Sequence, residues 1–215
     1  MKRFALVTMV LAFCLGQSII TDAQSRQLKK AQKVEYKKKI KVLQKGNWEV
    51  FGTSHTLDVA LLQHYERLSK EGVTEVMGVT TSTNKNIGKE KLFMSACADY
   101  AKYAGSHVRG RIVEDMGSVM TTEEKAEFEH FYAAYENAVE KEIAGELQPS
   151  YMIYRSVGKN NGNVLYEFEG YYIVDEVAAS KARMRAFENA ARESAAARKY
   201  AKQVSKFIEE AFKTK

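Results

Sequence analysis

Three residues near the start of a predicted helix carry side chains that can take part in hydrolysis. Ser54, His55 and Asp58 combine a hydroxyl, an imidazole and a carboxylate within a short stretch. A serine hydrolase needs these groups in hydrogen-bonding contact, which proximity in sequence alone does not supply. Serine and aspartate are also common at helix starts, where they accept hydrogen bonds from backbone N–H groups. Helix capping is therefore the favoured interpretation of this cluster.

A second pairing, Glu127 with His130, has the Glu-x-x-His spacing that di-iron helix bundles use on two facing helices. The sequence has no second copy of this unit, and it lacks the serine elbow, the phosphate loop, the dinucleotide turn and the zinc helix. We therefore predict no catalytic, cofactor-binding or metal-ligating residues and no cofactor.

Five polar residues form the candidate ligand or partner surface. They flank the central predicted helix, three in the loop before it and two after it, and together they would make a polar lip: Asn84, Lys85, Asn86, Arg109 and Arg111. Loops and strand ends also hold charged residues by default, because connecting segments run over the protein surface. The alternative to a binding surface is therefore that these five residues are simply solvated polar side chains on loops.

The central segment is predicted to form a strand, a helix and a second strand. Val76–Thr81 is rich in β-branched residues, which favours a strand. The next segment places apolar residues at helical spacing and ends near Gly105, and Val108–Val113 again has the composition of a strand. Cys97 lies on the apolar face of this helix, so we expect a buried, inert thiol.

Shorter elements surround this unit. Trp48–Phe51 is predicted to be extended, and a helix capped by Thr53 or Ser54 should run to about Ser69. A further helix should run from Thr122 to about Gly145, with an aromatic stripe that we expect to be core: Phe128, Phe131, Tyr132, Tyr135 and Val139.

The last third of the chain begins with a predicted hairpin. Two strand-like runs, Tyr151–Val157 and Val164–Val174, are separated by a loop that contains Asn161-Gly162, a strong turn signal. Val177–Phe212 then has neither glycine nor proline and predicts a long helix, either broken near its start or projecting toward a partner. The predicted fold class is α+β, a small, mostly antiparallel sheet covered by helices, with a long C-terminal helix.

The amino terminus is predicted to be a cleaved signal peptide over residues 1–23. Lys2 and Arg3 precede an uncharged apolar run, and small residues end at Ala23. Lipidation at Cys14 is disfavoured because the bulky Phe13 precedes it. Residues 24–46 form a basic arm with nine basic residues and one acid, whereas residues 47–215, predicted to be one domain, carry 22 basic and 25 acidic residues. Such an arm suits an anionic surface, although a solvated helix is the simpler interpretation.

The central unit resembles a small envelope-lipoprotein family whose core is a strand, a helix and a hairpin, a core also similar to the amino-terminal domain of a flagellar assembly protein. The resemblance covers about residues 73–175 and rests on Gly78-Val79-Thr80-Thr81, the helix Lys91–Ala101 and Gly105–Arg111. It departs from that family by lacking a lipobox and by inserting the aromatic helix. No catalytic motif is carried over.

Over its full mature length, which begins after residue 23, the chain resembles a family of uncharacterised exported proteins of Bacteroidota. The matching stretches are Gly52–Leu57, Phe131–Glu136 and Ser180–Ala186. This resemblance implies an envelope location and an α+β fold, and it implies no activity.

The sequence therefore favours a non-enzymatic exported protein of the cell envelope, acting as a binding or assembly module in the periplasm, at the outer membrane or outside the cell. The alternative is a secreted hydrolase that acts on a cell-wall or dietary polymer. The expected partners are an envelope protein or an anionic surface polymer rather than nucleic acid, with self-association through the C-terminal helix as a further candidate.

Overall fold

The structure is a computed structural model that describes residues 30–210. The chain divides into two units, residues 1–47 and residues 48–215. In the first unit residues 30–45 form a helix. The predicted signal peptide and residues 24–29 of the predicted arm lie outside the described residues.

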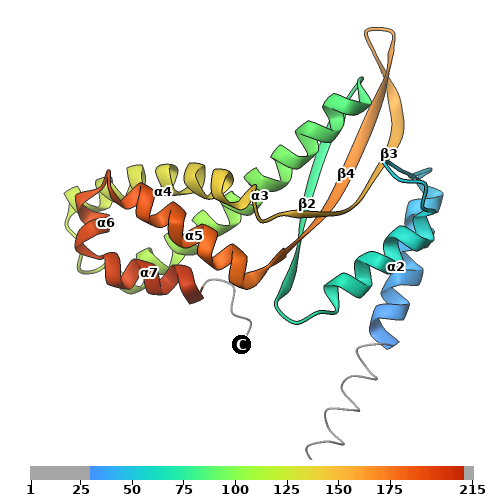
Figure 1. The fold of residues 1–215 in the computed structure, drawn as a ribbon. Coiled ribbons are helices and arrows are strands. Elements are labelled where there is room, and N and C mark those ends of the chain that lie inside the picture. Colours follow the sequence, from blue (N-terminus) through green and yellow to red (C-terminus); the bar gives the residue numbers. More distant parts are fainter. Residues whose placement is uncertain (1–29, 211–215) are drawn as a thin grey trace, which may run out of the picture. The chain divides into compact units, whose positions relative to one another are not determined.

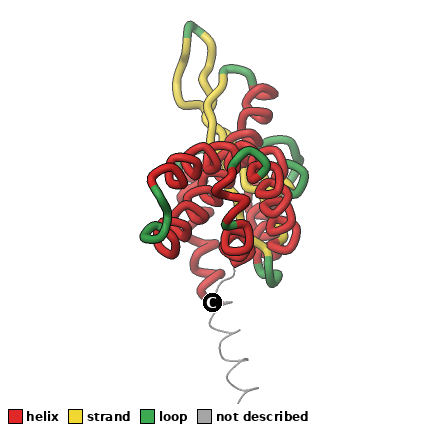
Figure 2. Tube along the Cα trace, turned by 90° about the vertical axis from the view of Figure 1, so that its left-hand side faces the viewer, coloured by secondary structure: helices red, strands yellow, loops and turns green. Residues whose placement is uncertain are grey.

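The second unit contains a four-stranded antiparallel sheet with the order β1-β3-β4-β2. Its strands are β1 (Glu49–Val50), β2 (Val73–Ser82), β3 (Gln148–Asn160) and β4 (Asn163–Asp175). Asn161 and Gly162 join β3 to β4 with φ values of 50° and 81°, the positive values that a two-residue hairpin turn requires. The predicted hairpin is confirmed, and its tip projects beyond the helices of this second unit (Figure 1, Figure 2).

Helix α3 (Lys85–Met116) packs on one face of this sheet. Two glycines on neighbouring strands make this possible, because a Cβ atom on Gly78 would lie 2.3 Å from the Leu92 carbonyl oxygen and one on Gly170 would lie 2.5 Å from the Leu92 side chain. Side chains alternate between faces along a strand. We call the glycine-bearing side the α3 face, and the opposite side, which carries Glu75, Met77 and Tyr171, the α2 face.

The α2 face takes its name from helix α2 (Leu57–Leu68), which contacts β1, β2 and β3. Its amino terminus is capped by Thr56, whose side chain accepts a hydrogen bond from the Val59 N–H group. The helix therefore begins slightly later than Thr53 or Ser54, the predicted caps. Ala60, Leu61 and His64 are its buried residues.

The predicted strand over Val108–Val113 is wrong, because these residues continue α3 to Met116. Val108 and Ile112 are fully buried, whereas Val113 is exposed. A spacing of four between buried residues suits a helix that packs along one side, so tertiary burial outweighs the strand preference of the β-branched residues.

Helix α4 (Thr122–Ile143) and α5 (Glu176–Ala191) complete the main core beside the C-terminal half of α3 (Figure 1). Thr121 and Glu124 form a capping box at the start of α4. The predicted aromatic stripe is confirmed as core, since its members are all buried. Arg183 of α5 is also fully buried, where it donates hydrogen bonds to Tyr100 and Glu176, each at 2.5 Å.

The predicted α+β class is confirmed, but the predicted long C-terminal helix is wrong. The segment forms three helices, α5, α6 (Ala195–Lys199) and α7 (Ala201–Glu210). Ser194 caps α6 by accepting from the Ala197 N–H group, and the Glu127 carboxylate accepts from the Ala196 N–H group at 2.6 Å. The chain therefore turns back, and Val204, Phe207 and Ile208 of α7 are buried in the core. Self-association through this segment stays a prediction.

Candidate functional site

Asn84, Lys85 and Asn86 lie at the amino terminus of α3. The Asn84 side chain accepts hydrogen bonds from the N–H groups of Asn86 and Ile87 and so caps the helix. The Lys85 ammonium group lies 3.9 Å from the ring centroid of Tyr154 and 4.8 Å from that of Tyr166. Its hydrogen bond with Tyr154 raises the pKa of Lys85. These contacts account for Asn84 and Lys85 as a cap and a cation–π clamp on the hairpin.

Arg109 and Arg111 do not join these three residues in one lip. They lie within α3 rather than on a following strand, and Arg109 comes 23 positions after Asn86, which is about 35 Å of helix. Arg109 pairs with Glu129 at 2.6 Å and Arg111 pairs with Asp115 at 2.9 Å. The two arginines do not lie together either, because Arg109 packs over Tyr132 of α4 and Arg111 over Phe207 of α7, so the predicted single surface does not form.

A cluster on the α2 face joins a histidine, a carboxylate and a serine. The Nδ1 atom of His64 lies 3.0 Å from the Ser150 hydroxyl oxygen, and its Nε2 atom lies 2.5 Å from a Glu75 carboxylate oxygen. His64 is 2% exposed, whereas the Glu75 side chain is 38% exposed. Both ring nitrogens thus have a partner, one on β3 and one on β2.

Each member of the cluster is positioned by a different element. His64 lies on the buried side of α2 with Ala60 and Leu61. Glu75 extends from β2, and Ser150 lies at an irregularity of β3, between Pro149, which pairs with Tyr172, and Tyr151, which pairs with Tyr171. A β-bulge of this kind reorients a side chain relative to the regular strand.

Aromatic rings enclose the imidazole. The His64 ring packs edge-on against Tyr65, Tyr151 and Tyr171, and the rings of Tyr151 and Tyr171 are stacked with centroids 4.4 Å apart. Burial raises the pKa of both stacked phenols. They therefore stay neutral and form a stable apolar wall around the histidine.

The order of hydrogen bonds permits general base chemistry. When the Glu75 carboxylate accepts the proton of Nε2, the lone pair of Nδ1 is free to accept the Ser150 hydroxyl proton. An acid, an imidazole and a hydroxyl in this sequence form the arrangement by which hydrolases activate a serine. In addition, the Arg67 guanidinium donates to the Pro149 carbonyl at 3.1 Å, so a positive charge lies one residue from Ser150.

Sequence reasoning missed this cluster because its members are far apart along the chain. His64 is 11 residues from Glu75 and 86 residues from Ser150, and no local motif joins them. Ser54, His55 and Asp58, the residues that the sequence pattern singled out, do not cap α2, because Thr56 does: Ser54 and His55 are exposed before the helix, and Asp58 lies in its first turn.

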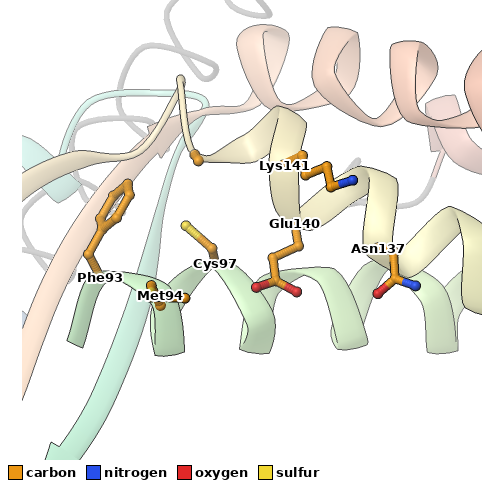
Figure 3. A pocket seen from close by; sticks show the side chains of 7 residues that line it. Phe93, Met94, Cys97, Asn137, Glu140 and Lys141 are labelled. Carbon is orange, nitrogen blue, oxygen red and sulfur yellow. The ribbon is translucent and has the colours of Figure 1, made fainter. Parts of the chain in front are cut away.

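A hollow lies between α3 and α4 (Figure 3). It has a volume of about 390 Å³, with Phe93, Met94 and Cys97 from α3 facing Asn137, Glu140, Lys141 and Ala144 from α4 and the residue after it. Burial, together with the Glu140 charge, raises the pKa of the Cys97 thiol to about 11. The thiol is therefore protonated at neutral pH and a poor nucleophile, consistent with the predicted buried position.

Within residues 30–210 no group of three or more histidine, cysteine, aspartate or glutamate side chains is arranged to hold a metal ion. Glu127, half of the Glu-x-x-His pair, instead accepts the Ala196 N–H group, and His130 is exposed. No helix among the described residues has both the length and the apolar character needed to cross a membrane.

Comparison with known proteins identified no relative of this chain. No family model, curated protein or solved structure matches the chain.

Proposed function

We propose that the protein is an exported binding or assembly module of the cell envelope and that its contact surface is the open part of the α2 face. The observation that carries the proposal is the exposure of Met77 and Val79, which are 45% and 42% exposed. They are neighbours on one face of β2, a strand at the edge of the sheet. A long edge strand with apolar side chains is a natural pairing surface for another chain.

The backbone of β2 supports an extended partner. The Val79 N–H group donates to the Ser95 hydroxyl at 3.4 Å and so points away from β4. Backbone groups of alternate residues point to the same side of a strand, and those of Glu75, Met77 and Thr81 therefore face the outer edge as well. An extended segment can add to such an edge through main-chain hydrogen bonds.

The charge of the α2 face indicates which side chains a partner segment would carry. Glu75 and Glu169 lie on it beside the exposed apolar side chains. Glu75 contacts His64 and Glu169 accepts a hydrogen bond from the Tyr171 hydroxyl, whereas Glu167 is paired with the cationic Arg155 at 2.7 Å. An acidic surface with apolar residues is complementary to a segment that alternates basic and apolar side chains. We therefore propose an extended segment of this kind, in another envelope protein, as the partner.

The binding test uses two synthetic peptides, one alternating lysine with valine and one alternating glutamate with valine. Fluorescence anisotropy with the full-length chain should detect binding of the lysine peptide only. Met77→Arg should weaken that binding at least about tenfold, since it places a cation against a cationic peptide. Met94→Arg is the matched control, because Met94 is 63% exposed but lies on α3. Equal effects of the two substitutions, or equal binding of both peptides, would contradict the proposal.

Export rests on the sequence of residues 1–23 and has its own test. Amino-terminal sequencing of the protein recovered from fractionated cells should show a mature chain that begins at Gln24, in the periplasm, the outer membrane or the medium. An intact Met1 in the cytoplasmic fraction would contradict export.

The basic first unit supports a second candidate, binding to an anionic surface polymer. The helix over residues 30–45 carries seven lysines and one glutamate, and such a charge excess attracts polyanions. Deleting residues 24–46 should abolish binding to anionic liposomes or polymer and leave thermal stability nearly unchanged. Undiminished binding after the deletion would eliminate this candidate.

A further inference from the structure

We infer that the α2 face also carries an acyl-transfer site, with Ser150 as nucleophile, His64 as general base and Glu75 as the residue that positions His64. The inference goes beyond the proposed binding function and does not depend on it. It is carried by the two hydrogen bonds of the imidazole, 3.0 Å to the Ser150 hydroxyl and 2.5 Å to the Glu75 carboxylate.

The burial and contacts of Ser150, His64 and Glu75 are consistent with these three roles. Ser150 is half-buried, so an external substrate can approach this residue more readily than the fully buried His64. His64 is held between two partners and a wall of tyrosine rings, which limits its movement. Glu75 is 38% exposed, so water reduces the cost of its negative charge while it holds the Nε2 proton.

The substrate class is a carboxylic ester with a small acyl group, because the rings of Tyr65, Tyr151 and Tyr171 crowd the histidine. The Ser150 oxygen attacks the ester carbonyl while its proton passes to His64 Nδ1. The bond to the alcohol then breaks, and the alcohol leaves with that proton. Water attacks the acyl-serine and gives a proton to Nδ1, and Ser150 takes up this proton as it leaves as the hydroxyl. The net reaction converts ester and water to acid and alcohol.

Arg67 is the residue that we assign to stabilisation of the oxyanion. Its guanidinium is fixed on the Pro149 carbonyl, one residue from the nucleophile. A cation in this position would stabilise the oxyanion that forms when Ser150 attacks.

The primary test is covalent labelling of the wild-type full-length chain with a fluorophosphonate, followed by peptide mass spectrometry. We expect the label on Ser150 in the native protein and its loss after unfolding in urea. Ser156 is the matched control, because it is an exposed serine on the same strand. Failure of the native protein to label at Ser150, or equal labelling of Ser150 and Ser156, would overturn the inference without requiring any variant to fold.

Variants then separate the roles. Ser150→Ala should abolish hydrolysis of p-nitrophenyl acetate, and His64→Gln should lower the labelling rate at least about 100-fold, the usual contribution of a general base. Ser156→Ala should have no effect. Glu75→Gln should slow labelling at least about tenfold, and Glu75→Asp, which keeps the carboxylate, should restore part of the rate. Equal rates for Glu75→Gln and Glu75→Asp would show that the Glu75 carboxylate does not position His64. Ser150→Ala should still bind the lysine-valine peptide, so the two proposals can fail separately.

Discussion

The two faces of the sheet are built in opposite ways. On the α3 face, Gly78 and Gly170 bring α3 so close that added Cβ atoms would lie 2.3 Å and 2.5 Å from atoms of Leu92. On the α2 face, the shorter α2 covers only part of the surface and contributes His64 to a polar cluster with Glu75 and Ser150. One face is closed by small residues, and the other holds polar groups beside exposed apolar side chains.

This difference separates what stabilises the domain from what is available for function. Close packing of apolar surface stabilises the fold, whereas a buried polar cluster contributes less than an apolar core of the same size unless all its groups are paired. Proteins commonly accept such a cost where a site is built. We therefore expect substitutions on the α3 face to change stability and substitutions on the α2 face to change binding or reactivity.

The largest effect on stability should come from Gly78→Ala on the α3 face. The new methyl group meets backbone atoms, the Leu92 carbonyl oxygen at 2.3 Å and the Ala96 nitrogen at 2.9 Å, so α3 must move away. We expect a loss of about 2–3 kcal/mol in the free energy of unfolding, measured with urea. Gly110→Ala is the control, because a Cβ there meets nothing within 4 Å. That change in a helix interior should stabilise by about 0.5–1 kcal/mol. Equal effects would show that the close approach is unimportant.

The next largest effect should be on the pH dependence of stability, through a buried tyrosine on the α3 face. Burial, with a contribution from Cys97, raises the pKa of Tyr172 on the α3 face to about 12. Since an unfolded tyrosine has a pKa of about 10, the neutral phenol stabilises the folded state below that pH, and this contribution is lost as the pH rises toward the folded value. The wild-type protein should therefore lose on the order of 2 kcal/mol in its free energy of unfolding as the pH rises over that range, and Tyr172→Phe should not show this loss. An unchanged alkaline unfolding curve would contradict the burial of this phenol.

On the α2 face, His64→Leu should cost less stability than Gly78→Ala and yet remove all labelling of Ser150. The substitution leaves Glu75 and Ser150 without the imidazole, but both have access to water. We expect a loss of about 1–2 kcal/mol in urea unfolding. A loss greater than that of Gly78→Ala would mean that the cluster is a principal stabilising feature of the fold.

The smallest effect on stability should come from Met77→Arg, which we expect to change the free energy of unfolding by less than about 0.5 kcal/mol because the side chain is already exposed. The same variant should lose binding of the lysine-valine peptide. If thermal unfolding moves by many degrees, Met77 belongs to the packed core rather than to a contact surface.

Elements with a long, regular pattern could be predicted from the sequence. The hairpin around Asn161-Gly162 and the aromatic face of α4 have such patterns, and local preference and tertiary burial agree there. They disagree at Val108–Val113, where β-branched residues lie in a helix because Val108 and Ile112 face the core. The turn before α6 has no glycine or proline, and it is fixed by the Ser194 cap and by Glu127 from α4, a contact that no local pattern contains.

The candidate site could be predicted only in fragments. Asn84 and Lys85 are at a helix start as their loop position suggested, but the misassigned strand placed Arg109 and Arg111 near them in error. His64 follows Ala60 and Leu61 at helical spacing, which indicates burial and not its partners. Glu75 and Ser150 meet it through the pairing of β2, β4 and β3 and through a bulge in β3, and these are properties of the folded sheet.

Hydrogen–deuterium exchange of the full-length chain, with and without the lysine-valine peptide, tests most directly whether the α2 face is the functional one. We predict that the peptide slows exchange in residues 73–82, the edge strand β2, and leaves the hollow between α3 and α4 unchanged. Slower exchange in residues 93–97 and 137–144, with no change in β2, would contradict the account and move the contact surface to that hollow.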